Sequence, residues 1–373
     1  MNIAGKEYNT IWVKENDNSI IQVIDQSFLP FEFRIKELSS VEDVYTTIKD
    51  MHIRGAPLIG VAAAFGIYLA LVKYDQNTPL NEYLLSAAEK LKSSRPTAIN
   101  IKHAVDSQLE VINMYNTADE KRNAAFKNAL KISETEKENC RLIGEFGLPV
   151  IKNISHQKKG SPVNILTHCN AGWLACIDYG TATAPIYMAH DSGINVHVWV
   201  DETRPRNQGA RLTAWELEQH GVPFTIITDN AGGHIMQHGL VDIVIVGSDR
   251  TTITGDVANK IGTYLKALAA NDNNIPFYVA LPSSSIDWNI EDGINEIPIE
   301  LRDSDEIKYI QGLINGKIKN VMITGDNFPA RNFGFDVTPA KFVNGLITER
   351  GICKANKSSI ISLFPEKFKN SDK

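Results

Sequence analysis

The sequence predicts an α/β protein with a mainly helical N-terminal domain that contains a few short strands, followed by a doubly wound domain built on a parallel sheet. Three observations support this prediction. The chain has 373 residues, which is more than one ordinary hydrophobic core requires. Helical periodicity dominates from Val41 to about Leu148. From Ser161 onward, short β-branched runs alternate with stretches of helical length, as in parallel strands joined by helical crossovers.

The N-terminal domain is expected to span residues 1–155. Two short strands, Ser19–Ile24 and Phe31–Glu37, should precede its helices. The segment Gly55–Val72 carries no charge and is long enough to raise the question of a membrane span. Its Gly-Ala-Pro start and its many Gly and Ala residues give weak transfer into lipid and suit close packing. We therefore expect a buried helix and no membrane contact.

The second domain is expected to span residues 156–373. A linker is predicted at Asn153–Ser161, because the local sequence Lys-Lys-Gly-Ser-Pro is typical of a loop. Ligands of open parallel sheets bind outside the carboxyl ends of the strands, so the residues after each strand are the first candidates for a site. The expected strands are Asn164–His168, Asn195–Val200, Phe224–Thr228, Ile243–Val246, Pro276–Ala280 and Asn320–Ile323.

The composition argues against several classes of function. Acidic and basic residues are mixed along the chain and give a formal net charge of −6, without the Lys/Arg stripe that nucleic acid requires. The four cysteines show no C-x-x-C spacing and no clustering with histidines, so neither a disulfide framework nor a metal site is indicated. The first residues lack the apolar core of a signal peptide, which makes the cytoplasm the expected location.

Polar and reactive residues follow four of the predicted strands, and one crevice could gather them. Any one of these segments could simply form a turn or a helix N-cap. The segment at Asp229 is the most structural of the four, a tight turn into a helix, and Asp201 and Glu202 could act as supporting partners. The four segments are His168-Cys169-Asn170-Ala171-Gly172, Asp201-Glu202-Thr203-Arg204-Pro205, Asp229-Asn230-Ala231-Gly232-Gly233 and Gly247-Ser248-Asp249-Arg250.

A small anionic substrate is indicated by the segment Arg54-Gly55-Ala56-Pro57. Proline suits the first turn of a helix, backbone N–H groups at Gly55 and Ala56 are open to a phosphate, and Arg54 can add charge-assisted hydrogen bonds. The segment Arg95-Pro96-Thr97-Ala98-Ile99-Asn100 repeats the arrangement, although two ordinary helix starts would give the same pattern. Neither G-x-G-x-x-G after a strand nor G-x-x-x-x-G-K-[ST] occurs, so dinucleotide or nucleoside triphosphate binding is not expected.

Taken in order along the chain, these motifs resemble the methylthioribose-1-phosphate isomerase family from about residue 20 to about residue 355. Each motif alone is moderately specific, whereas the ordered set is highly specific. Ser248 departs from the family, which often has Ala or Thr there. The matching segments are Arg54–Pro57, Arg95–Asn100, Thr167–Gly172, Asp201–Pro205, Gly247–Arg250 and Gly255–Thr263.

The resemblance implies an aldose–ketose isomerase of methionine salvage that converts 5-methylthio-α-D-ribose 1-phosphate to 5-methylthio-D-ribulose 1-phosphate. It also implies a Rossmann-like second domain without a nucleotide and a homodimer. No cofactor is expected, because the sequence shows no metal ligand set and moving a hydrogen from C2 to C1 requires no redox cofactor. Cys169 and Asp249 match the catalytic cysteine and aspartate of the family. The residues expected to hold the substrate phosphate and hydroxyls are Arg54, Gly55, Ala56, Arg95, Gln208, Asn259 and Lys260.

Several alternatives share this fold, namely isomerases of 5-deoxyribose 1-phosphate or ribose 1,5-bisphosphate and non-catalytic regulatory subunits of the translation initiation exchange factor. A binding module needs no paired acid and thiol, so Cys169 and Asp249 favour an enzyme. A second phosphate would need basic donors beyond this set, which favours an uncharged group on C5. Whether Cys169 relays a proton through an enediol or assists a direct hydride shift stays open.

Overall fold

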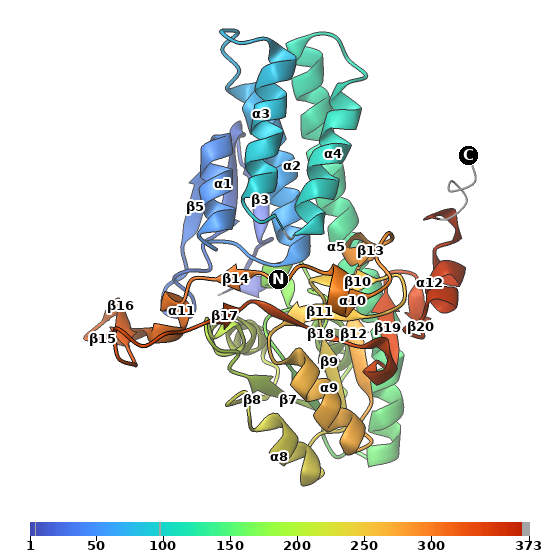
Figure 1. Ribbon diagram of the computed structural model, residues 1–373. Coiled ribbons are helices and arrows are strands. Elements are labelled where there is room, and N and C mark those ends of the chain that lie inside the picture. The colour runs from blue at the N-terminus through green and yellow to red at the C-terminus, as the bar shows by residue number, and fades with distance from the viewer. Residues whose placement is uncertain (4, 97, 368–373) are drawn as a thin grey trace.

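The protein is described by a computed structural model that covers residues 1–3, 5–96 and 98–367. Thr97, inside one of the predicted phosphate-binding segments, lies outside the described residues. Figure 1 shows a bundle of helices at the top and a sheet flanked by helices below it. The predicted fold class is confirmed, because a helical N-terminal part precedes a large, mostly parallel sheet.

The N-terminal part begins with strands and continues as helices. β3, β4 and β5 form an antiparallel three-stranded sheet. The first predicted strand is confirmed within β4, whereas the second is shorter than predicted and begins at Ile35. The elements are β1 (Asn2–Ile3), β2 (Lys6–Glu7), β3 (Ile11–Lys14), β4 (Asp17–Ile24), β5 (Ile35–Leu38), α1 (Val41–Lys49), α2 (Ala56–Val72), α3 (Leu80–Ser93), α4 (Ile99–Ile112) and α5 (Ala118–Lys158).

Helix α2 is the centre of this bundle, and it packs against α1, α3, α4 and α5. Because neighbours surround it, the helix can be apolar on every side. The stretch Ala56–Lys73 is long and apolar enough to cross a membrane, but 89% of it is buried inside the protein. The predicted buried helix is therefore confirmed, with Pro57 in its first turn.

Helix α5 joins the bundle to the sheet. It begins at a capping box in which the Thr117 side chain and the Glu120 side chain each accept from the other's backbone N–H. It packs against α2 and α4 at one end and against α6 and β19 further along, as the green helix in Figure 1 shows. The predicted linker at Asn153–Ser161 is therefore wrong as far as Lys158, which still belongs to the helix. The division into two domains near residue 155 stays a prediction.

A seven-stranded sheet forms the second part, in the order β20-β19-β12-β9-β6-β7-β8. All neighbouring pairs are parallel except β19 with β20. Five of the six predicted strands are confirmed in it. The strands are β6 (Val163–Thr167), β7 (Val196–Asp201), β8 (Phe224–Ile227), β9 (Ile243–Val246), β12 (Phe277–Ala280), β19 (Gly345–Thr348) and β20 (Gly351–Cys353).

The sixth predicted strand, Asn320–Ile323, is wrong as a member of this sheet. Most of it lies in β16 (Lys317–Met322), which pairs with β15 (Tyr309–Ile314) in a two-stranded hairpin. Figure 1 shows this hairpin projecting at the left edge of the molecule. The sheet position beside β12 belongs instead to β19, whose sequence Gly-Leu-Ile-Thr is fully buried.

The order in which the chain adds strands to the sheet changes direction between β6 and β9, although these two strands are parallel. From β6 the chain moves outward to β7 and β8, then returns to the other side of β6 and continues through β9, β12 and β19. Leu166 in β6 pairs directly with Val244 in β9. In open α/β sheets, such a switch point creates the crevice in which ligands bind.

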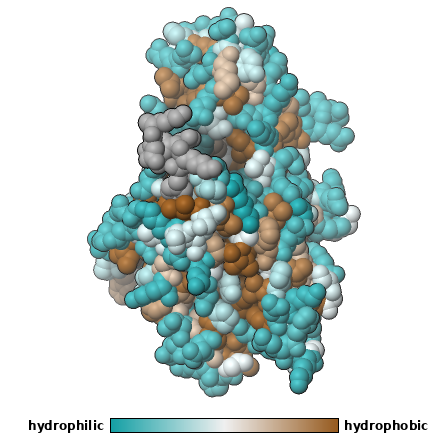
Figure 2. Space-filling model, turned by 90° about the vertical axis from the view of Figure 1, so that its right-hand side faces the viewer, coloured by the Kyte–Doolittle hydropathy of each residue, from teal (hydrophilic) through white to brown (hydrophobic). Residues whose placement is uncertain are grey.

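A smaller four-stranded sheet, in the order β13-β10-β11-β18, lies next to the carboxyl ends of the large sheet (Figure 1). The face drawn in Figure 2 is mostly hydrophilic, with hydrophobic side chains gathered near its middle. The remaining elements are β10 (Arg250–Thr252), β11 (Val257–Lys260), β13 (Ile286–Asp287), β14 (Leu301–Arg302), β17 (Asn332–Phe333), β18 (Phe335–Thr338), α6 (Ala184–Asp191), α7 (Ala214–His220), α8 (Gly232–Gln237), α9 (Thr263–Asp272), α10 (Gly293–Glu296), α11 (Asp305–Lys308) and α12 (Lys357–Leu363).

Candidate active site

A pocket opens at the switch point of the large sheet, beside the N-terminus of α2. Six of the nine predicted site residues line it, and they come from three separate parts of the chain. These six residues are Arg54, Gly55, Ala56, Cys169, Asp249 and Asn259. The first and last of these residues, Arg54 and Asn259, are far apart in the sequence, so it is the topology of the sheet that brings them together.

Cys169 follows β6 and is held on both sides of its backbone. Its N–H donates to Thr203 Oγ1 at 2.8 Å, and its carbonyl accepts from Thr213 Oγ1 at 2.7 Å. The residue adopts a φ of 64°, a conformation that is uncommon outside glycine and often found at functional sites. Burial raises the pKa of the thiol, although the charges of Arg54 and Lys260 oppose the rise. The environment thus favours the protonated thiol over the thiolate.

Asp249 follows β9, the strand next to β6. Its backbone N–H donates to the carbonyl of Ala258 at 3.0 Å, which ties it to β11 of the smaller sheet. Burial raises the pKa of its carboxyl, while Lys260, Arg54 and Arg95 lower it. A buried carboxyl with a raised pKa is suited to giving a proton to a substrate oxygen.

Arg54 is oriented by the residue that follows the thiol. Its Nη1 donates to Asn170 Oδ1 at 2.5 Å and its Nη2 donates to the Asn170 carbonyl at 2.6 Å. Asn170 in turn donates from Nδ2 to Glu216 Oε1 at 2.8 Å. Burial raises the pKa of Glu216 to about 7, against hydrogen bonds that lower it. Glu216 was not predicted from the sequence, because a glutamate in α7 gives no local signal of this contact.

The N-terminus of α2 forms part of the pocket wall. Its N-cap, Gly55, has a φ of 99° and gives no side-chain cap to the first helical N–H groups. A Cβ at this position would lie 2.3 Å from the carbonyl oxygen of Ala175, so only glycine fits. Uncapped N–H groups and the helix dipole attract an anion, and Arg54 adds a full positive charge beside them.

Three predicted site residues do not line this pocket. Lys260 is buried nearby, its Nζ donates to the Gly334 carbonyl at 3.0 Å, and burial lowers its pKa. Arg95 pairs with Glu300 at 2.8 Å, yet its charge still acts on Asp249. Gln208 lies in an adjoining hollow that Arg54 also lines. Neither polar atom of the Gln208 side chain has a hydrogen-bond partner among the residues that the structure describes.

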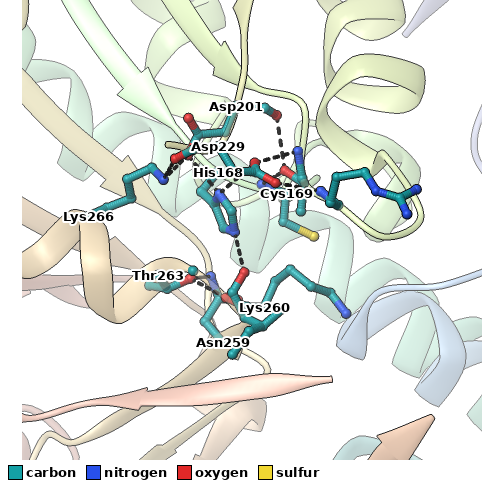
Figure 3. A network of polar contacts seen from close by, with 12 residues as sticks. His168, Cys169, Asp201, Asp229, Asn259, Lys260, Thr263 and Lys266 are labelled. Atoms are coloured by element: carbon teal, nitrogen blue, oxygen red, sulfur yellow. Dashed lines mark hydrogen bonds and ion pairs between the residues drawn. The ribbon is translucent and has the colours of Figure 1, made fainter. Parts of the chain in front are cut away.

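A group of three possible metal ligands lies next to the pocket, made of His168, Asp201 and Asp229, with ligand atoms within 4.8 Å of one another. The ammonium of Lys266 lies 3.0 Å from Asp201 Oδ2 and donates to the carbonyl of Asp229. Figure 3 shows these side chains joined in one network, with the Cys169 thiol and the Lys260 side chain beside it. Lys266 therefore already supplies a cation to the carboxylate of Asp201. The absence of a metal site, expected from the sequence, stays a prediction.

Known proteins are similar to this chain over nearly its whole length. The chain is 57% identical over 370 residues to the methylthioribose-1-phosphate isomerase of Desulfatibacillum aliphaticivorans, which covers 99% of this chain and 100% of that protein. The chain belongs to the methylthioribose-1-phosphate isomerase family. Residues 52–355 also match the model of the initiation factor 2 subunit family.

Two solved structures show how widely this isomerase fold is shared. The 5-methylthioribose 1-phosphate isomerase of Pyrococcus horikoshii OT3 superposes with a TM-score of 0.82 at 38% identity, covering 97% of each chain. The translation initiation factor eIF-2B delta subunit of A. fulgidus superposes with a TM-score of 0.78 at 34% identity, covering 96% of this chain and 100% of that one. Since both classes share the fold, the site has to separate them.

Proposed function

We propose that this chain converts 5-methylthio-α-D-ribose 1-phosphate to 5-methylthio-D-ribulose 1-phosphate in methionine salvage. The observation that carries the proposal is the meeting of Cys169 and Asp249 in one buried pocket, at the ends of two adjacent strands. A pure binding module would need an anion site but no paired acid and thiol. The 57% identity to a methylthioribose-1-phosphate isomerase supports the same substrate.

The phosphate is proposed to bind at the N-terminus of α2. Arg54, together with the first N–H groups of the helix at Gly55 and Ala56, offers charge-assisted donors on one side of the pocket. Asn259 lines the same pocket and its Nδ2 donates to Thr263 Oγ1 at 3.0 Å, which leaves its Oδ1 for a sugar hydroxyl. Lys260, Arg95 and Gln208 are proposed to close around the sugar from the flanks.

Ring opening is proposed to start at Asp249. The anomeric oxygen of the substrate carries phosphate, so the ring cannot open by loss of a hydroxyl proton, and its ring oxygen has to be protonated instead. Asp249, with its raised pKa, gives a proton to that oxygen as the bond between C1 and the ring oxygen breaks. The carboxylate left behind is stabilised by the charges of Lys260 and Arg54.

A hydrogen then has to move from C2 to C1. In a hydride shift, the C2 hydrogen moves with its electron pair to C1, and the proton of the C2 hydroxyl passes to the Asp249 carboxylate as the ketone forms. In an enediol route, Cys169 would remove the C2 hydrogen as a proton, which requires a thiolate. Burial raises the pKa of the Cys169 thiol, so its protonated form is favoured. A protonated thiol cannot remove the C2 hydrogen as a proton, and the hydride shift is therefore the proposed route. Cys169 then forms an apolar wall beside the reacting carbons.

The first experiment is turnover of 5-methylthioribose 1-phosphate by the purified protein, beside Cys169→Ser and Asp249→Asn. Competition with 5-deoxyribose 1-phosphate and ribose 1,5-bisphosphate ranks the C5 group. Cys353→Ser, a cysteine outside the pocket, is the matched control. Loss of turnover in both site variants but not in the control supports the proposal. A folded wild-type protein that turns over none of the three sugars overturns it in favour of a regulatory binding protein.

Substrate deuterated at C2 separates the two hydrogen routes. A hydride shift keeps the deuterium and carries it to C1 of the product, even in ordinary water. An enediol route exchanges the hydrogen with solvent through the thiol. Deuterium that is largely lost from the product would contradict the role proposed here for Cys169 while leaving the isomerase activity itself intact.

A homodimer in the cytoplasm is also proposed. Hydrophobic side chains gather near the middle of the face in Figure 2, and such a patch on a protein surface is typical of a contact with another chain. Two-fold homo-oligomers are the commonest assemblies. Light scattering coupled to size exclusion tests the dimer, and a mass equal to the single 41.4 kDa chain at micromolar concentration would argue against it.

A further inference from the structure

His168 stands between the catalytic thiol and the segment that holds Asn259 and Lys260. It is buried, with 1% of its surface exposed. Its Nδ1 lies 2.8 Å from Asp201 Oδ2, and its Nε2 lies 2.8 Å from the carbonyl oxygen of Ile261. Figure 3 shows the ring spanning the two contacts, with Asp201 above it and the Asn259–Lys260 segment below.

Both neighbours of the ring can only accept hydrogen bonds. A carbonyl oxygen has no proton to give, so Nε2 carries a hydrogen. The same Asp201 oxygen, Oδ2, lies 3.0 Å from the ammonium of Lys266, so it acts as an acceptor and Nδ1 donates to it. Both ring nitrogens of His168 therefore face acceptors. The fixed pair of contacts assigns both ring protons without any choice of tautomer.

Charged groups from several elements surround the ring. Asp201 at the end of β7 and Asp229 after β8 are negative, the latter with Oδ1 4.0 Å from Nδ1 of the ring. Lys266 on α9 is positive, and Asp336 on β18 also interacts with both His168 and Lys266.

The contact at Ile261 reaches the substrate-holding segment directly. Ile261 follows Lys260, and the next residue, Gly262, starts the turn into α9 with a φ of 103°. A Cβ on Gly262 would lie 3.1 Å from Cε1 of the ring, so glycine lets the backbone approach the histidine. The hydrogen bond thereby connects β6 of the large sheet to β11 of the smaller one.

We propose that His168 is a positioning residue whose ring, by donating from both nitrogens to Asp201 and Ile261, sets the distance between the Cys169 strand end and the Asn259–Lys260 segment. Cys169 is the next residue after His168, so the ring anchors one end of the connection at the thiol. Its other end holds the backbone that presents Asn259 and Lys260. The role rests on the proposed function only in its kinetic consequences, because the charge state of the ring is a property of the folded chain alone.

The charge state is tested first, on the full-length wild-type protein with ¹⁵N-labelled histidine. We expect one buried imidazole with protons on both nitrogens, in slow exchange with solvent, from about pH 6 to about pH 8. Asp201→Asn identifies the signal, since loss of the carboxylate should remove the Nδ1 proton while Nε2 keeps its own. A wild-type spectrum with a single protonated nitrogen on every histidine in this range overturns the proposal, whatever the protein catalyses.

Two matched variants then separate positioning from general stability. Glutamine can place its amide nitrogen where Nε2 of histidine lies, so His168→Gln keeps the donation to Ile261. Asparagine can place its amide nitrogen where Nδ1 lies, so His168→Asn keeps only the donation to Asp201. Both lose the ring and its charge. We expect His168→Asn to have a KM about tenfold higher than His168→Gln, the factor that corresponds to one lost hydrogen bond.

A purely structural role predicts a different result. In that case the two variants would lose thermal stability together and share the same KM, which would overturn the proposal. If neither variant folds, the ¹⁵N spectrum of the wild type still decides the protonation on which the proposal depends. If the wild type shows no isomerase activity, the proposed function fails, and the spectrum again tests the histidine bridge independently.

Discussion

The guanidinium of Arg54 gives two hydrogen bonds to one residue, Asn170, with Nη1 at 2.5 Å from its amide oxygen and Nη2 at 2.6 Å from its carbonyl oxygen. Asn170 directly follows Cys169 in the chain. The arginine proposed to bind the phosphate is thus tied to the backbone that presents the thiol. Binding and chemistry share one rigid connection, so a change at either end should affect both.

Replacing Arg54 by lysine tests this connection. A lysine ammonium has no planar fork and cannot reach both oxygens of Asn170 while facing a phosphate. We expect Arg54→Lys to raise KM for the sugar phosphate at least tenfold and to lower kcat as well, because the Cys169 backbone loses its tie. Steady-state kinetics measure both constants. Arg141→Lys, an exposed residue of α5 that pairs with Glu138, serves as the control and should change neither.

Gly172 has no room for a side chain. A Cβ built on it would lie 1.8 Å from Glu216 Oε2, and Glu216 cannot move because it accepts from the N–H groups of Trp173 and Leu174. We expect Gly172→Ala to lower the free energy of unfolding by about 3 kcal/mol, through overpacking and loss of these bonds. Denaturant unfolding measures the loss. Gly312→Ala, where a Cβ meets nothing within 4 Å, is the matched control. Equal stability of the two variants would contradict the close approach.

Lys260 controls the protonation of Asp249 through its charge. Burial raises the pKa of Asp249 and Lys260 lowers it, so removal of the ammonium should raise that pKa further. In the proposed mechanism the acid form of Asp249 starts the reaction, so kcat should fall on the alkaline side as Asp249 loses its proton. We therefore expect Lys260→Met to move this alkaline limb to higher pH, with a lower maximum. A limb that stays in place, or moves to lower pH, would show that another group sets it.

Glu136 should make stability depend on pH. Burial raises its pKa from 4.5 to about 7, against weaker lowering by hydrogen bonds from Ser284 and Asn139. The folded state thus holds the proton more tightly than the unfolded state. The favourable contribution is complete below pH 4.5 and is lost as the pH rises to about 7, at which point Glu136 ionises in the folded protein.

Glu136→Gln removes this titration. At pH 5 the variant and the wild type should be about equally stable, because both side chains are neutral there. Above pH 7 the variant should be more stable by up to about 3 kcal/mol, since each pKa unit corresponds to about 1.4 kcal/mol. Urea unfolding at both pH values measures the difference. Glu138→Gln, fully exposed on the same helix, should show no such dependence on pH.

The strands of the large sheet show where sequence patterns succeed. β6, β7, β8, β9 and β12 were predictable because buried parallel strands read as short β-branched runs. The run at Asn320–Ile323 has the same appearance, yet it lies in an exposed hairpin. An apolar run does not show which strand it will pair with. The sequence therefore could not show that Asn320–Ile323 belongs mostly to a hairpin and that β19 takes the place beside β12, because packing decides both.

The residues of the site also fall into two groups, those that the sequence predicted and those that it did not. The motif around Cys169 and the residues after β9 were recognisable because side chains at strand ends are set by local sequence. Glu216 and Lys266 were not, because each contacts the site from a helix whose sequence gives no sign of it. The predicted linker failed for the same kind of reason, since polar residues at the end of α5 can continue a helix as well as end one.

By itself, the sequence determined the fold class, the buried α2 helix, and the positions of Cys169 and Asp249 after their strands. These are local properties, set by periodicity and by the residues adjacent in the chain. Only the tertiary structure decided that Cys169 and Asp249 line one pocket at the ends of β6 and β9, and that the His168 ring contacts the Ile261 backbone. Contacts between distant segments depend on strand order and on how a second sheet packs against the first, and no short stretch of sequence encodes either.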